Sequence, residues 1–110
     1  MTNVFSVQEM LTRLLEARES YHEFLRPDSM SVGIYHLAAG EPDRQRPHTE
    51  DEIYYVMAGT GVIDIDGVRT AVEPGSVVYV DRHVPHRFED YPDGLTLLVV
   101  FAPARGSMAS

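Results

Sequence analysis

The apolar positions near the start of the chain follow a helical period. Between Ser6 and Ser20 they recur three and four residues apart, as on one face of an amphipathic helix: Val7, Met10, Leu11, Leu14 and Leu15. Ser6 is a residue type preferred at a helix N-cap, and Glu9 follows it at the spacing of a capping box. The pattern predicts a helix that packs through this face on the body of the protein or on a second subunit.

From Tyr21 onward the pattern changes to short β-prone segments separated by turn residues. Ile63 and Ile65 alternate with aspartates, which predicts a strand with one solvated face. Asp66-Gly67, directly after it, is a signal for a tight hairpin, and Pro74-Gly75 marks a further turn. About seven or eight such segments, with turns roughly every eight to twelve residues, predict an all-β antiparallel sandwich or barrel.

The length of 110 residues is that of one domain with a single modest core. We expect an N-terminal helix within residues 1–20, a β-barrel over residues 21–103 and a flexible tail over residues 104–110. The tail, "ARGSMAS", is expected to fray because its residues are mostly small and polar.

Composition and charge exclude several classes of function. The net charge of −8 argues against nucleic acid or an anionic membrane as a partner, since both require a basic surface. No apolar stretch is long enough for a membrane span and no signal peptide is recognisable, so we expect a cytoplasmic protein. There is no cysteine and no lysine, which excludes a thiol nucleophile and Schiff-base chemistry. Chemistry must come from the remaining polar side chains or from a bound metal.

A dense polar cluster precedes an apolar strand in the middle of the chain. His48, Glu50, Asp51 and Glu52 stand directly before "IYYVM". If the chain is extended here, His48, Glu50 and Glu52 lie on one face and can converge on a divalent cation. A distant strand must supply a further ligand, and His86 in "VPHRF" offers it. The alternatives are a polar network without metal and, for Glu50 and Asp51, a charged loop end.

The same two stretches resemble the two motifs of the cupin superfamily. "GEPDRQRPHTEDEIYYVMAG" is similar to the first motif, G-x5-H-x-H-x3,4-E-x6-G, except that Arg46 stands at its first histidine. "GSVVYVDRHVPHRFED" is similar to the second, G-x5-P-x-G-x2-H-x3-N, with His86 at the histidine. The family's proline, glycine and asparagine fall on Asp81, His83 and Asp90.

The chain therefore resembles a small single-domain RmlC-like cupin over Tyr21–Pro103. The resemblance implies an all-β fold, the double-stranded β-helix or jelly-roll barrel, here with a short N-terminal α-helix. Carried over residue by residue, it implies the metal ligands His48, Glu52 and His86. Two imidazoles and one carboxylate form the facial triad of non-haem Fe(II) and also suit Zn, Mn or Ni.

Three further residues are candidates for the site. Glu50 is a possible fourth ligand if the strand is regular. Arg46 is a candidate for binding substrate, as a bidentate clamp on an anion, or else forms a salt bridge with Glu50 or Asp51. Tyr54, one strand step beyond Glu52, is a candidate for lining the cavity or belongs to the core.

These features predict a small metal-binding cupin whose barrel holds a divalent cation and a small organic ligand. With Fe(II) it would be a dioxygenase; with Zn, Mn or Ni it would be an isomerase, lyase or hydrolase. The alternatives are a non-enzymatic binding or sensor module with a degenerate metal site, and a purely structural interaction domain. No catalytic side chain stands out. Similar small cupins are commonly homodimers, so we expect a homodimer that pairs through its helix and the edge segment "YHEFLR".

Overall fold

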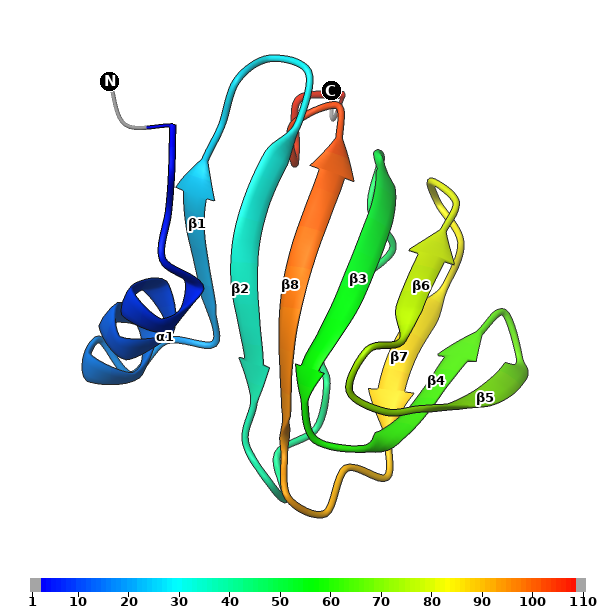
Figure 1. Cartoon of the computed structure of the whole chain (residues 1–110). Coiled ribbons are helices and arrows are strands. Elements are labelled where there is room, and N and C mark those ends of the chain that lie inside the picture. Colours follow the sequence, from blue (N-terminus) through cyan, green and yellow to red (C-terminus); the bar gives the residue numbers. More distant parts are fainter. Residues whose placement is uncertain (1–2, 109–110) are drawn as a thin grey trace.

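The structure is a computed structural model, and it describes residues 3–108 (Figure 1). Within these residues it contains one helix and eight strands: α1 (Val7–Glu16), β1 (Tyr21–Leu25), β2 (Ser31–Leu37), β3 (Asp51–Ala58), β4 (Gly61–Ile65), β5 (Val68–Val72), β6 (Val77–Val80), β7 (His86–Glu89) and β8 (Leu95–Ala102). The strands form a five-stranded sheet in the order β1-β2-β8-β3-β6 and a three-stranded sheet in the order β5-β4-β7. All pairings are antiparallel, so the predicted all-β jelly-roll fold is confirmed.

Alternation along the strands places the core between the two sheets. In β3, Tyr54 and Val56 are fully buried while Ile53 and Tyr55 are exposed. β8 runs through the middle of the larger sheet and contributes the largest run of buried positions, including Leu97. The predicted hairpin at Asp66-Gly67 joins β4 to β5, and both residues have the positive φ that such a tight turn requires.

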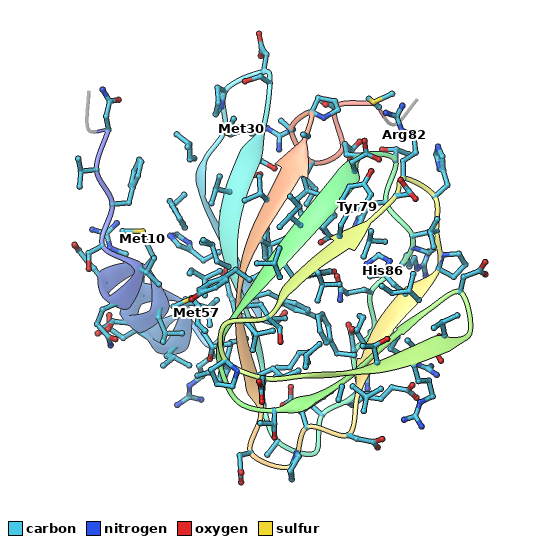
Figure 2. The ribbon with its side chains drawn as sticks, turned by 45° about the vertical axis from the view of Figure 1, so that its right-hand side comes forward. Met10, Met30, Met57, Tyr79, Arg82 and His86 are labelled. Atoms are coloured by element: carbon cyan, nitrogen blue, oxygen red, sulfur yellow. The ribbon has the colours of Figure 1, made fainter. Side chains whose placement is uncertain are left out.

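The N-terminal helix packs on the outer side of the five-stranded sheet. The side chain of Ser6 accepts a hydrogen bond from the backbone N–H of Glu9, as the predicted N-cap requires. The helix ends at Glu16, earlier than expected, because Arg18 takes a left-handed conformation with φ of 56°. Its apolar face is used within the chain: Met10 packs in one cluster with Ile34 and Met57 (Figure 2). The described helix, α1, is not long and apolar enough to cross a membrane.

The part of the outer face that the helix leaves uncovered is apolar. Ile53 and Tyr55 of β3 are 42% and 43% exposed, and their β6 neighbours Tyr79 and Val77 are 53% and 66% exposed. β6 is also an edge strand of its sheet. We call Ile53, Tyr55, Val77 and Tyr79 the outer patch.

The segment after β8 lies against the barrel along residues 104–108. Ala104 is buried, and the backbone N–H of Arg105 donates to the hydroxyl of Ser31 at 2.9 Å. The N–H groups of Gly106 and Met108 donate to the two carboxylate oxygens of Glu50, at 2.8 and 3.2 Å. These bonds hold the segment because Glu50 itself is buried. Residues 1–2 and 109–110 of the expected terminal segments lie outside the described residues.

We predict that Glu50→Gln destabilises the protein by about 1–3 kcal/mol, because an amide nitrogen cannot accept a hydrogen bond and one of the two N–H groups loses its partner. Urea unfolding should show the loss, while Glu73→Gln, a matched change at an exposed glutamate, should change the free energy of unfolding little. Equal stability of the two variants would contradict the role of Glu50 as the anchor.

Candidate metal centre

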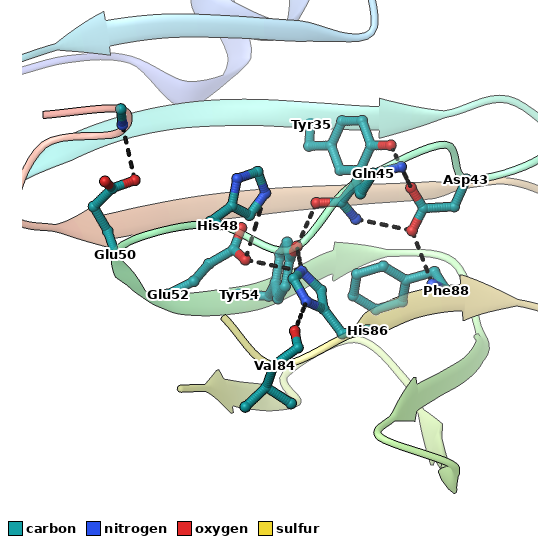
Figure 3. A network of polar contacts seen from close by, with 11 residues as sticks. Tyr35, Asp43, Gln45, His48, Glu50, Glu52, Tyr54, Val84, His86 and Phe88 are labelled. Atoms are coloured by element: carbon teal, nitrogen blue, oxygen red, sulfur yellow. Dashed lines mark hydrogen bonds and ion pairs between the residues drawn. The ribbon is translucent and has the colours of Figure 1, made fainter. Parts of the chain in front are cut away.

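The loop between β2 and β3 is held by one buried carboxylate. Asp43 is 5% exposed and accepts hydrogen bonds from the Tyr35 hydroxyl at 2.8 Å and the Phe88 N–H at 2.8 Å. It also accepts from the backbone N–H and the side-chain amide of Gln45, at 3.1 and 2.8 Å (Figure 3). Asp43 therefore ties the loop to β2 and β7 and fixes the direction of Gln45.

The chain bends at Thr49 and Glu50, before β3 begins at Asp51. The bend breaks the period of two that an extended chain would have kept. As a result His48 and Glu52 face the same interior point, while Glu50 turns toward the C-terminal segment (Figure 3). Because of this bend, Glu50 does not lie on the face of His48 and Glu52, where a regular strand would have placed it.

The turn before β7 supports His48 from the other side. The N–H of His83 donates to the carbonyl oxygen of His48 at 2.6 Å. His83 and Asp90 have φ values of 65° and 53°, the left-handed region that glycine and asparagine tolerate best. These are the positions at which the cupin motif has glycine and asparagine, so the backbone shape is kept although the residues differ. The His83 side chain is exposed.

His48, Glu52 and His86 each present one ligand atom, and these atoms lie within 4.8 Å of one another. The Oε1 atom of Glu52 is 4.0 Å from Nε2 of His48 and 3.1 Å from Nε2 of His86. The Nε2 atom of His48 and both carboxylate oxygens of Glu52 are buried and have no hydrogen-bond partner among the described residues. A buried carboxylate without partners is costly, so these atoms fit a cation that the protein binds.

The orientation of His86 leaves the nitrogen that faces Glu52 available as a ligand. Its Nδ1 atom lies 2.9 Å from the carbonyl oxygen of Val84, which can only accept, so Nδ1 carries the proton. In the neutral ring the lone pair is then on Nε2, the atom next to Glu52. A hydrogen bond from the second ring nitrogen to a carbonyl is the usual support of a metal-binding histidine.

Tyr54 stands behind His86. Its hydroxyl donates to Oε1 of Gln45 at 2.6 Å and lies 3.0 Å from Nε2 of His86. Burial, together with the Glu52 carboxylate, raises the pKa of Tyr54 well above its usual range, so the phenol keeps its proton. Tyr54 is 0% exposed and lies outside the cavity described below, so the structure places it as a support for His86 rather than against a ligand.

The pKa values of the two histidines are shifted in opposite directions. Burial lowers the pKa of His48, and the nearby Glu52 carboxylate opposes this without overcoming it. For His86 burial also lowers the pKa, but contacts with Glu52 and the Val84 carbonyl outweigh it and the pKa is raised. Both imidazoles must be neutral at Nε2 to bind a cation, so the cation competes with a proton mainly at His86.

A cavity of about 720 Å³ opens beside these groups. His48 and Glu52 line it, as do Arg46 and Arg105, and apolar walls come from Val99 and Phe101. Arg46 is exposed and forms no ion pair with Glu50 or Asp51. The volume is within the usual range for a small-molecule site.

Sequence reasoning missed four residues of the centre: Tyr21, Asp43, Gln45 and Arg105. The sequence around each of them does not mark it as part of a site, since each is one polar or aromatic residue among similar neighbours. Their roles depend on contacts with distant segments, as for Arg105, whose guanidinium carbon lies 5.1 Å from the ring centroid of Tyr21.

Comparison with known proteins agrees with this architecture. A family profile described as "Cupin domain" matches residues 33–101. The chain is 46% identical over 84 residues to an uncharacterised protein of Streptomyces coelicolor, covering 76% of this chain and 80% of that protein. It is 32% identical over 78 residues to the dimethylsulfoniopropionate lyase DddW of Ruegeria pomeroyi, covering 71% of this chain and 51%, about half, of the lyase.

Among solved structures, the chain is similar to a conserved protein with a double-stranded β-helix domain from Klebsiella pneumoniae. The TM-score is 0.76 at 19% identity, covering 94% of this chain and 91% of that chain. At this identity the likeness concerns the fold alone. The matched profile spans both motif regions and more than half of the sequence, and the two antiparallel sheets are those of its fold. The chain therefore belongs to the cupin family.

Proposed function

We propose that this protein binds one divalent cation through His48, Glu52 and His86 and a small organic ligand in the adjoining cavity, and that it acts as a metal-dependent enzyme. The observation that carries the proposal is the set of buried atoms without hydrogen-bond partners, Nε2 of His48 and both oxygens of Glu52. Together with Nε2 of His86 they give two imidazoles and one carboxylate that converge from the loop before β3, from β3 and from β7. This donor set suits Fe, Zn, Mn or Ni.

Of the chemistries open to this set, we favour lyase or isomerase chemistry over oxygenation. A bound Zn, Mn or Ni ion would polarise a carbonyl or carboxylate of the ligand, whereas Fe(II) would also support a dioxygenase. The support for a lyase is the 32% identity to a protein named as a dimethylsulfoniopropionate lyase. Because the chain spans about half of that protein, its activity and substrate remain a proposal for this chain.

The chain's own residues would hold the ligand and exclude water. Arg46 lines the cavity as an unpaired cation and would orient an anionic group of the ligand. The ring of Tyr54 packs beside His86, and its hydroxyl is held by Gln45, whose amide donates to Asp43, so this support is rigid. Val99 and Phe101 provide the apolar wall that limits water around the ligand.

The alternative, a non-enzymatic binding or sensor protein, rests on Arg46, which replaces the first motif histidine and leaves three ligands. Metal content separates the two proposals, because an enzyme of this kind requires about one ion per chain.

Elemental analysis of protein purified without a metal-affinity step should find close to one ion per chain. A His48→Ala, His86→Ala double variant should lose it, because only the Glu52 carboxylate remains. The matched control, His22→Ala with His83→Ala, removes two histidines outside the ligand set and should keep the metal. Absence of metal from the wild-type protein, even after reconstitution with Fe, Mn, Ni and Zn, would reject the enzyme and leave a metal-free binding barrel.

We predict that Tyr54→Phe weakens metal binding by up to about tenfold although no ligand is lost, since the variant loses the hydrogen bond to Gln45 that fixes the ring packed beside His86. Tyr55→Phe is the matched control, because Tyr55 points to the outer face of the same strand. Competition with a chromophoric chelator measures both affinities. Equal affinities would mean that Tyr54 belongs only to the core.

The homodimer and the cytoplasmic location stay predictions. For the dimer we propose the outer patch as the interface, because α1 occupies the other half of this face and β6 offers an unpaired edge. Light scattering should give a dimer for the wild-type protein and a monomer for Val77→Glu with Tyr79→Glu. Val68→Glu, at an equally exposed valine on β5, should remain a dimer. A wild-type monomer at high concentration would contradict this assembly.

A further inference from the structure

The arginines of this acidic chain differ in whether they form ion pairs with carboxylates. Five of the nine form ion pairs with carboxylates on the surface: Arg13, Arg26, Arg69, Arg82 and Arg87. Of the four that form none with any described residue, three line the cavity beside the candidate metal centre, namely Arg44, Arg46 and Arg105, and the fourth is Arg18. Cations gathered along one concavity attract anions.

The charge balance of the cavity also favours an anionic ligand. Its carboxylates are those of Glu41 and Glu52, against three guanidinium groups. Glu52 belongs to the ligand set, so a divalent cation would neutralise it and leave the cavity clearly positive. A neutral ligand would leave this charge without a counterpart, whereas a ligand with two negative groups would offset most of it.

Arg105 is the most firmly placed of the three arginines. Its backbone N–H is bonded to Ser31, and its guanidinium lies over the rings of Tyr21 and Phe101, with Cζ 5.1 and 5.9 Å from their centroids. Phe101 in turn touches His48, with ring centroids 4.8 Å apart. Arg105 is therefore one side chain away from a candidate metal ligand.

Tyr21 adds a donor that the protein leaves unused. Its hydroxyl is buried and has no hydrogen-bond partner within residues 3–108, and Tyr21 lines the cavity. The ring occupies the space where a side chain at position 33 would be, since a Cβ on Gly33 would come within 2.6 Å of it. Burial is the main reason that the pKa of Tyr21 is raised to about 12, so the hydroxyl keeps its proton and can donate.

We propose that the ligand is a small organic dianion, with one group at the metal position and a carboxylate held by the guanidinium of Arg105 and the hydroxyl of Tyr21. The group at the metal position rests on the proposed function, whereas the carboxylate position rests on Arg105 and Tyr21. A guanidinium presents two parallel N–H donors that match a carboxylate, and a phenol adds a third. Arg46 and Arg44 complete the positive lining of the same cavity.

Calorimetric titration of the Co²⁺-loaded protein with succinate and succinamate tests this. The two probes are similar in size and differ by one charge, and both retain one carboxylate for the metal. The wild-type protein should prefer succinate by about tenfold or more, as expected for a hydrogen bond between charged groups. Arg105→Gln should abolish the preference and Tyr21→Phe should reduce it severalfold. Arg13→Gln, on the helix outside the sheet, removes the same charge and should leave the preference unchanged.

Each other outcome has a definite meaning. An unchanged preference for succinate in a folded Arg105→Gln variant would overturn the assignment. If that variant does not fold, Arg105→Lys takes its place and should lose part of the preference. An Arg105→Lys variant with the full wild-type preference would then overturn the assignment. Inorganic phosphate binding as tightly as succinate would reject a carboxylate site. If Co²⁺ does not bind, the proposed function fails, and the metal-free protein tests Arg105 alone: a persisting preference for succinate supports the subsite, and equal weak binding rejects it.

Discussion

Asp43 is the residue on which the site most depends. Its buried carboxylate joins the loop before β3 to β2 through Tyr35 and to β7 through Phe88, and it directs Gln45 toward Tyr54. From there the contacts continue to Nε2 of His86. The two motif regions are far apart in sequence, so this chain of polar contacts is what holds one histidine in register with the other. A buried carboxylate of this kind is stabilising only when its oxygens have hydrogen-bond donors, and Asp43 accepts four such bonds.

The three consecutive carboxylates show how one polar cluster divides among separate roles. Glu50 binds the backbone of the C-terminal segment, Asp51 accepts from the backbone and side chain of Arg82, and Glu52 faces the cavity. Burial of Glu50 raises its pKa, but hydrogen bonds from Thr49, Gly106 and Met108 outweigh this and the pKa is lowered. The carboxylate thus stays charged and keeps Arg105, which follows the last strand, beside the cavity.

Several features could be predicted because they depend on local pattern. The helix, its N-cap at Ser6, the hairpin at Asp66-Gly67 and the antiparallel all-β arrangement are confirmed. The jelly-roll fold, which the resemblance to cupins implied, is confirmed as well. The donors His48, Glu52 and His86 were named from motif spacing, and the structure brings them together. The position of residues 104–108 could not be predicted, since small polar residues are expected to be flexible unless a partner such as Glu50 is known.

The sequence by itself determined the strand pattern, the turns and the types and spacing of the three donors, because these follow from side-chain periodicity and from glycine and proline at turns. Only the tertiary structure decided that Glu50 turns away from the donors, that Tyr54 supports His86, and that Arg105 lies over Tyr21. The first depends on a bend that breaks the strand alternation. The others depend on packing between segments distant in sequence, and no local pattern encodes which of many similar residues will meet there.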